Sequence, residues 1–457
     1  LVVTSPCHNR YSKRPEVTPS NTEVISSTDT RGPRAGRRTA QHRRSRRLAI
    51  PSAIAVAAGN ASGMLIGMAS GIVTARLLGP NDRGAFVATQ TMAGVAAVVL
   101  TLGVTQAVVT DRGSDGDLVG PLLAQVTAVA LAGCALFGAL AATRVQPWLD
   151  APAVIGAAAA TAGGVASSLA SGMAQRRSRM TGEFQAVRLI PMLGSLLLLV
   201  TAWLAGTRDV GVWILASGAG VALPAVGVLV RTLGGLNALH GLRSTVPARS
   251  LVLGAAIAFP TAVGAQIIYR LDSVVVAMTL PTASIAFYGV AATASLTCTA
   301  LGQAVGMVAF SRLRQATSLE HQRFLIRRGV MWALTVATAL ALPITLLAPN
   351  LITLCYGREF LPAVAPTRVL VLAAIPLSVD YLLIHALLIL AGQRSVYQTQ
   401  ALAVTLTIGG LCVTVPTGNL VFISATSTTV YTLSATLLFS AAVRRTSPRR
   451  TTFVEQP

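Results

Sequence analysis

Long apolar runs, separated by short polar segments, recur along almost the whole sequence and limit what the chain can fold into. A helix needs about 20 consecutive apolar residues to cross the hydrocarbon core of a bilayer. Apolar residues make up 53% of the 457-residue chain and charged residues only 11%, which is too little polar surface for a soluble domain. We therefore predict an all-α polytopic membrane protein with about 12 transmembrane helices. The runs lie near residues 49–78, 84–109, 119–143, 151–175, 184–205, 210–230, 250–280, 284–311, 329–348, 367–391, 398–416 and 419–442.

Arginines are distributed unevenly among the segments that join these runs. The formal net charge is +21, but no folded basic domain remains outside the runs, so we expect no nucleic-acid partner. Basic loops stay on the cytoplasmic side of a membrane. We therefore predict a multi-pass protein of the plasma (inner) membrane with both termini in the cytoplasm. We number the loops along the chain, so that loop one joins the first run to the second. Arginines are concentrated in the termini and the even-numbered loops, at residues 37–47, 176–179, 231–249, 312–328 and 444–450. The odd-numbered loops hold only Arg83, Arg144, Arg208, Arg358 and Arg368.

The longest basic inner segment after the N-terminal arm divides the runs into two sets of six. Leu78-Gly79-Pro80, after the first run, has a partial echo in Leu280-Pro281, after the seventh. Equal numbers of spans and such an echo favour two parallel six-helix lobes around a central cavity. The predicted parts are a disordered basic cytoplasmic arm (1–47), an N-terminal lobe (48–230), a cytoplasmic linker (231–249), a C-terminal lobe (250–442) and a basic cytoplasmic tail (443–457).

Small residues mark two of the runs as packing helices. Gly59, Gly63, Gly67 and Gly71 recur every fourth residue of the first run and therefore lie on one side of a helix. We expect them to admit another helix of the same bundle, with a partner subunit as the alternative. The fourth run, around residues 157–164, consists almost wholly of Ala, Gly and Thr, which suits tight packing within a bundle.

No residue pattern in the chain indicates covalent chemistry. The sequence contains no HExxH, P-loop or GxSxG motif, and its five cysteines form no CxxC or Cys/His pair with metal-ligand spacing. We therefore predict that the protein is not an enzyme and uses no cofactor and no metal.

Three segments resemble the polysaccharide and lipid-linked oligosaccharide flippases, of the O-antigen flippase type, in the multidrug/oligosaccharidyl-lipid/polysaccharide transporter superfamily. The first is like that family's Leu-Gly-Pro-x-x-x-Gly turn after helix one. The second is like its Asp-containing seventh helix and the Tyr-x-x-Ala turn that follows. The third is like its Gly-x-x-Phe segment outside helix ten. The segments are Ala75–Phe86, Arg270–Val274 with Ala286–Ala291, and Tyr356–Ala363.

The resemblance implies a V-shaped bundle of two six-helix lobes and a transporter that works by alternating access. The substrate would be an oligosaccharide or polysaccharide precursor on a polyprenyl diphosphate carrier. Membrane lipids would be partners, and a glycan polymerase or glycosyltransferases are further candidates. Two alternatives in the same superfamily stay open. Lipid II flippases usually carry two more helices and more intramembrane arginines, and the cation-coupled multidrug antiporters often have an acidic residue in helix one, where this chain has Asn60.

Charged and polar side chains inside the runs are the candidate substrate-binding residues, because a centred charge costs at least about 2.5–3.5 kcal/mol in hydrocarbon. Gln266 and Arg270 are four apart in the seventh run and share a helix face. Asp272 lies roughly 200° around the helix from Arg270, so each charge needs another partner. Arg270 either binds the carrier diphosphate through its guanidinium fork or forms a structural interhelical ion pair.

Two further candidates, Asp380 and His385, lie in the tenth run. Asp380 pairs with Arg270 across the lobe or takes up the proton that drives transport. His385 either titrates near neutral pH or makes a buried structural hydrogen bond. The uncharged candidates face the cavity or join helices to one another, and they are Asn60, Gln90 and Gln303.

Overall fold

The computed structural model describes the backbone of residues 34–110, 115–144, 146–177, 182–235, 249–313, 316, 318–390 and 392–446. Within its helices, the side chains of residues 34–58, 60, 61, 110, 116, 182, 260–269, 300–312 and 393 are not described. By its contacts the chain separates into two units, Leu1–Ala49 and Ile50–Pro457. The predicted tail from residue 447 and the predicted arm as far as residue 33 lie outside the described residues, whereas residues 34–47 are helical.

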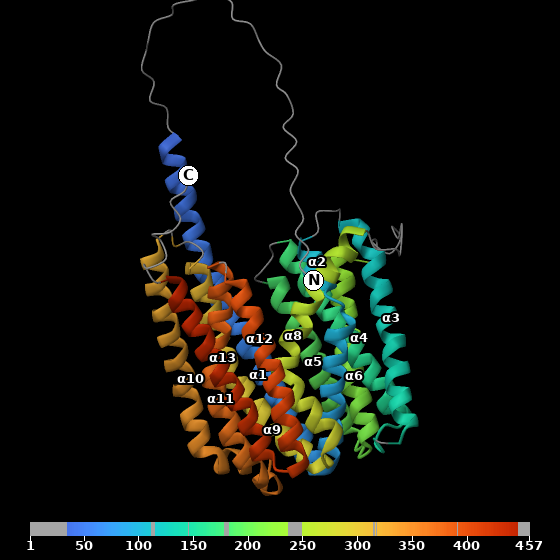
Figure 1. Cartoon of the computed structure of the whole chain (residues 1–457). Helices are drawn as coiled ribbons and strands as arrows, with labels where there is room; N and C mark the ends of the chain where they lie inside the picture. Colours follow the sequence, from blue (N-terminus) through green and yellow to red (C-terminus); the bar gives the residue numbers. More distant parts are fainter. Residues whose placement is uncertain are drawn as a thin grey trace, which may run out of the picture. The chain divides into compact units, whose positions relative to one another are not determined.

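Eleven of the twelve predicted runs lie within a helix of the structure, to within two residues at their ends, and the run 84–109 is divided between α1 and α2 (Figure 1). By length and hydropathy, nine segments of the described residues qualify as membrane spans, and the first of these, Ser62–Leu100, contains parts of two predicted runs. The prediction of an all-α polytopic membrane protein is confirmed. The helices are α1 (Arg34–Leu100), α2 (Val104–Thr110), α3 (Asp115–Ala142), α4 (Ala151–Arg176), α5 (Gly182–Leu204), α6 (Val210–Leu233), α8 (Arg249–Thr279), α9 (Thr282–Leu313), α10 (Leu319–Cys355), η1 (Arg358–Ala363), α11 (Val364–Ile389), α12 (Gln393–Thr414), η2 (Val415–Thr417) and α13 (Leu420–Thr446).

A sharp break at Gly79 divides α1 into two helices. Gly79 has φ 72° and ψ −179°, a backbone conformation that is essentially restricted to glycine. Pro80 follows, and proline suits the first position of a new helix because no intrahelical hydrogen bond is lost there. The Leu-Gly-Pro sequence therefore ends the first helix and starts the second, as the position of Gly79 and Pro80 between two apolar runs predicts.

The second half of α1 stops earlier than its apolar run. Leu102 and Gly103 both have positive φ, 52° and 74°, which separates α1 from the short α2. The Nε2 amide of Gln125, on α3, donates to the carbonyls of Leu100 (3.3 Å) and Thr101 (2.9 Å). These bonds satisfy carbonyl groups that the end of a helix leaves without partners.

Helix α4 is the packing helix that its small residues predict. In the most apolar 18-residue stretch of α4, 61% of the residues are buried, whereas in the corresponding stretch of α3 only 28% are buried. Helix α4 therefore faces protein more than lipid. A Cβ atom at Gly156 would lie 2.6 Å from the Ile214 carbonyl oxygen, and one at Gly163 would lie 2.8 Å from the Ala222 Cα atom. Both neighbours are on α6, whose backbone can approach α4 only because glycine occupies these positions.

The four glycines of α1 do not share one neighbour. Gly59 and Gly63 pack against Gln185 and Met192 of α5, which confirms a partner helix within the same chain for these two positions. Gly67 has nothing within 4 Å of where its Cβ atom would lie. Gly71 faces a guanidinium nitrogen of Arg83, from the other half of α1.

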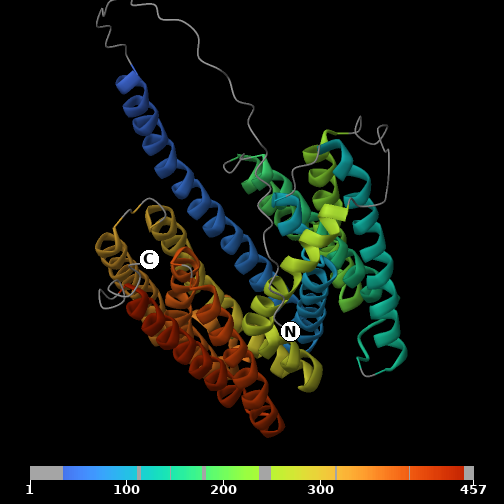
Figure 2. The same cartoon turned by 45° about the horizontal axis from the view of Figure 1, so that its top comes forward.

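Helix α8 contacts residues from both halves of the sequence. Near its start, Leu251 and Ala255 belong to a buried cluster with Ala107 and Leu229, and further along Val276 belongs to a cluster with residues of α9 and α13. Helices α10, α11 and α13 run side by side in both views (Figures 1 and 2). The division into two lobes at residues 231–249 stays a prediction.

Candidate functional site

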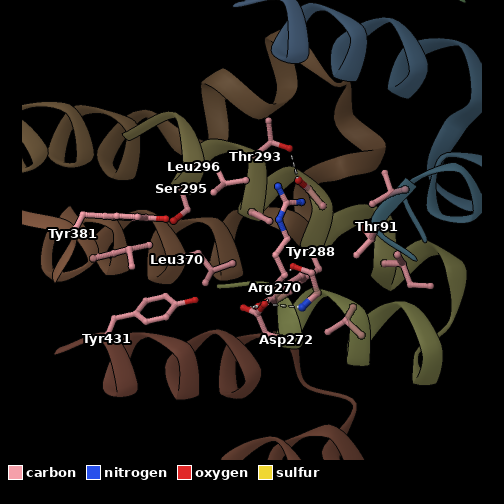
Figure 3. Close-up of a pocket in the computed structure, with 17 residues that line it drawn as sticks. Thr91, Arg270, Asp272, Tyr288, Thr293, Ser295, Leu296, Leu370, Tyr381 and Tyr431 are labelled. Atoms are coloured by element: carbon pink, nitrogen blue, oxygen red, sulfur yellow. Dashed lines mark hydrogen bonds between the residues drawn. The ribbon is translucent and has the colours of Figure 1, made fainter. Parts of the chain in front are cut away.

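A cavity lies where α8, α9, α11 and α13 face the second half of α1. Figure 3 shows Arg270 of α8 extending across the middle of the lining, with Thr91 of α1 on one side and Tyr381 and Tyr431 on the other. Arg270 is exposed, and its guanidinium has no hydrogen bond or ion pair among the side chains that the structure describes. A cation is thus available to a ligand in this cavity.

Asp272, in the same lining, is buried and firmly held. Its Oδ2 atom accepts hydrogen bonds from the Tyr288 hydroxyl (2.6 Å) and the Ser427 hydroxyl (2.9 Å). Its Oδ1 atom accepts from the backbone N–H of Ser273 at 2.6 Å and from the Ser273 hydroxyl at 3.3 Å. Groups from α8, α9 and α13 thus hold the carboxyl group of Asp272 in place. The sequence argument that Asp272 needs partners other than Arg270 is consistent with this geometry.

Asp380 is buried on α11 and accepts a 2.7 Å hydrogen bond from the Ser434 hydroxyl of α13. It forms no ion pair with Arg270 in the described part of the chain, so that predicted pairing is absent. Its neighbour Tyr381 does line the cavity. A hydroxyl on the adjacent helix is thus one partner of this acidic residue in the middle of α11.

Two other candidates with described side chains, His385 and Gln90, do not line this cavity. The Nδ1 atom of His385 lies 2.7 Å from the Tyr381 carbonyl oxygen, one turn earlier on α11, which is a structural contact. Gln90 donates from Nε2 to the Ser217 hydroxyl at 2.8 Å, joining α1 to α6, and Ser195 is 2.9 Å from that hydroxyl. Side chains outside the described residues are those of Asn60, Gln266 and Gln303.

Several hydroxyl-bearing residues of the site were not predicted from the sequence. Tyr288 and Ser427 hold Asp272, and Tyr381 and Tyr431 line the cavity. Tyrosine hydroxyls within apolar runs are a usable signal, because a buried hydroxyl needs a partner. That signal does not indicate which helix supplies the partner, since Ser427 is 155 positions from Asp272.

The basic segment after α4 has a structural role in this fold. Arg176 forms an ion pair with Asp115 at 3.0 Å, and Arg177 forms another at 2.8 Å. Both arginines also donate to backbone carbonyls, those of Val108 and Thr232. These contacts join the start of α3 to the ends of α2, α4 and α6.

The arrangement around Arg270 supports binding rather than covalent chemistry. An exposed guanidinium beside hydroxyl groups can hold an anionic, hydroxyl-rich ligand, because guanidinium pairs with phosphate oxygens and hydroxyls exchange hydrogen bonds with sugars. The carboxyl group of the neighbouring Asp272 already accepts hydrogen bonds from Tyr288, Ser427 and Ser273, so these groups and not Arg270 are its partners.

Solved structures with the same arrangement of helices are membrane transporters. A lipid II flippase, MurJ, in an inward closed conformation, has a TM-score of 0.65 at 10% identity, covering 87% of this chain and 90% of that chain. An inward-facing multidrug resistance MATE transporter has a TM-score of 0.62 at 13% identity, covering 85% and 96%. A MOP superfamily transporter from Pyrococcus furiosus has a TM-score of 0.58 at 12% identity, covering 86% and 95%. The protein therefore has the fold of the MOP superfamily transporters.

The family follows from the sequence match. A model of the polysaccharide biosynthesis protein family matches residues 73–365, which is more than half of the chain. The protein belongs to this family, and the resemblance inferred from its three motifs is confirmed. The chain has no match among curated protein sequences.

Proposed function

We propose that this protein is a flippase that moves a polyprenyl-diphosphate-linked oligosaccharide or polysaccharide precursor across the plasma membrane by alternating access. The observation that carries the proposal is the exposed guanidinium of Arg270 in a cavity lined with hydroxyl groups, within a chain of the polysaccharide biosynthesis family. A diphosphate-linked glycan has the two matching features, an anionic group and many hydroxyls.

Arg270 is the proposed contact for the diphosphate. Its fork of N–H donors matches two phosphate oxygens at once, and such charge-assisted bonds are roughly twice as strong as neutral ones. The glycan would then meet the hydroxyls of Ser295, Tyr381 and Tyr431, which line the same cavity. The polyprenyl chain needs no protein pocket, because it stays in the hydrocarbon.

We propose that the buried carboxylates of this lobe couple transport to an ion gradient. Asp380 accepts a hydrogen bond from the Ser434 hydroxyl, and uptake of a proton by Asp380 would let it donate to that hydroxyl instead. Such a change alters the contact between α11 and α13, two helices of the cavity wall. An Asp380→Asn variant mimics the protonated form, and we expect it to exchange substrate across the membrane without responding to the gradient.

Depletion of the protein in its host tests the function directly. We expect the lipid-linked glycan to accumulate on the cytoplasmic leaflet and the mature glycan to disappear from the surface. Surface glycan that appears at a normal rate in the depleted strain, with no related protein replacing it, would refute the flippase proposal.

A purified Arg270→Ala variant tests the site. We expect it to insert and fold normally but to lose at least tenfold in translocation, because the diphosphate loses its bidentate partner. Arg270→Lys keeps the charge without the fork and should fall between the two. Arg231→Ala is the matched control, since Arg231 is an exposed arginine in the last turn of α6, outside the cavity lining. Full activity in Arg270→Ala would remove Arg270 from the site.

Two other transport functions use the same fold. A cation-coupled multidrug antiporter is favoured by the two buried carboxylates, Asp272 and Asp380, in one lobe. A lipid II flippase is the other candidate. Proteoliposomes supplied in parallel with a lipid-linked oligosaccharide, lipid II and a cationic drug distinguish the three, since each function predicts movement of a different compound.

We also propose that both termini lie in the cytoplasm, with a glycan polymerase or glycosyltransferases as partners on this pathway. The uneven arginine distribution supports this orientation. Single cysteines at Arg208 and Arg231, in a background without the native cysteines, should react with an impermeant maleimide from the outside and the inside respectively. The opposite pattern would invert the topology.

A further inference from the structure

The kink of α1 contacts the far half of the sequence through Arg76. The Nε atom of Arg76 donates to the Cys355 carbonyl at 2.9 Å, and its Nη2 atom donates to the Leu354 carbonyl. These are carbonyls at the C-terminal end of α10, which have no intrahelical partner and carry partial negative charge. Arg76 therefore caps a helix that lies nearly 280 residues away in the sequence.

Arg83, just after the kink, is buried between aromatic rings of the same far segment. Only 2% of its surface is exposed, and its guanidinium carbon lies 4.7 Å from the ring centre of Tyr356 and 5.2 Å from that of Phe360. Among the residues that the structure describes, its Nε and Nη1 atoms are buried without a hydrogen-bond partner. The rings compensate part of the charge, but two donors remain without the bonds they would have in water.

The backbones of α1 and α9 touch beside these two arginines. A Cβ atom at Gly84 would overlap the carbonyl group of Thr282, the first residue of α9. The Thr282 hydroxyl also donates to Oδ1 of Asn81 at 3.3 Å. We call the contacts of Arg76, Arg83 and Gly84 with Thr282 and residues 354–360 the α1 clasp.

We propose that the α1 clasp is a gate that closes one end of the transport pathway, and that the buried Arg83 limits how tightly it closes. This inference rests on the proposed alternating access. Arg76 and Gly84 hold the gate shut through a helix cap and a backbone contact. Opening releases these contacts but hydrates the two partnerless donors of Arg83. The gains and losses oppose each other, which keeps the open and closed states close in free energy, as a transport cycle requires.

The proposal makes opposite predictions for the two arginines. Arg83→Leu removes the buried charge and its partnerless donors but keeps an apolar side chain between the rings, so the clasp should close more firmly. Arg76→Ala removes the cap of α10 and should loosen it. A purely structural role would predict damage of the same kind from both changes. Arg368→Ala is the matched control, because Arg368 is an exposed arginine of α11 whose Nε atom also donates to a carbonyl of α10, that of Thr345, within one half of the sequence.

The test uses Asn81→Cys with Thr282→Cys in full-length protein without native cysteines, reconstituted in proteoliposomes. We expect oxidation to join the pair, to reduce translocation at least tenfold, and to be reversed by a reductant. Relative to this parent, Arg83→Leu should cross-link at least threefold faster and transport at least tenfold more slowly, Arg76→Ala should cross-link at least threefold more slowly, and Arg368→Ala should not differ.

Two outcomes would overturn the proposal that the α1 clasp is a gate. One is unchanged transport by the cross-linked pair, and the other is equal cross-linking rates in the Arg83→Leu and Arg76→Ala variants. If Arg83→Leu does not fold, the cross-linked pair and Arg76→Ala still decide. A parent that moves no lipid-linked glycan would refute the proposed function instead, while the cross-linking rates, which need no substrate, would continue to test the clasp.

Discussion

The hydrogen bonds to Asp272 allow the charge state of a carboxylate within the membrane-spanning helices to be tested by stability measurements. Tyr288 and Ser427 both donate to Oδ2 of Asp272, at 2.6 and 2.9 Å, from two different helices. Interhelical hydrogen bonds between neutral groups in membrane proteins average about 0.6 kcal/mol, whereas a bond to a charged group contributes about 1.5–3 kcal/mol. If Asp272 is ionised, Tyr288→Phe and Ser427→Ala should each lower the free energy of unfolding by about 1.5–3 kcal/mol.

The assay is equilibrium unfolding of the purified protein in mixed micelles of increasing dodecyl sulfate, followed by circular dichroism. Ser378→Ala is the matched control for Ser427→Ala, because the Ser378 hydroxyl is equally buried but donates to the Ala374 carbonyl of its own helix. The double variant leaves Oδ2 without a donor, so its cost should differ from the sum of the single costs by about 0.5–3 kcal/mol. Single costs near 0.6 kcal/mol with no coupling would show that Asp272 is neutral and would refute the reasoning.

Three further predictions concern the region around the kink. Gly84→Ala should lower the free energy of unfolding, measured by thermal melting, by about 1–3 kcal/mol, because its methyl group overlaps the Thr282 backbone. The control Gly94→Ala has nothing within 4 Å of its new methyl group, so it should be neutral or gain up to about 1 kcal/mol. Equal effects of the two substitutions would contradict this reasoning. Gly79→Ala should cost about 1–3 kcal/mol in the same melting assay, since its φ of 72° with ψ of −179° strains any other residue. Burial raises the pKa of the Tyr356 phenol against the opposing effect of the Arg83 guanidinium. The neutral phenol should therefore contribute its full stabilisation below about pH 10, and this contribution should be lost as the pH rises through the raised pKa. The titration is followed by absorbance at 295 nm with Tyr356→Phe as the reference, and a Tyr356 that titrates like an ordinary tyrosine would contradict the prediction.

The candidate site was only partly predictable. Arg270 and Asp272 were identifiable because charged residues are costly in hydrocarbon and must have a reason to be there. The partners of Asp272 were not, and neither was the separation of Asp380 from Arg270. The helices of this protein are apolar nearly all around, so hydrophobic periodicity does not show which face turns toward which neighbour. That rotation decides which polar groups meet.

The sequence by itself determined most of the helices, the break at Gly79 and the family. Length and hydropathy select the spans because a bilayer imposes the same requirement on every segment independently, and Gly79 with Pro80 ends one helix and begins the next through local backbone geometry. Only the tertiary structure decided that Arg83, an arginine from a predicted outer loop, is buried against Tyr356, and that Tyr288 and Ser427 hold Asp272. The physical reason is that such contacts depend on how whole helices pack, which residues hundreds of positions apart determine together.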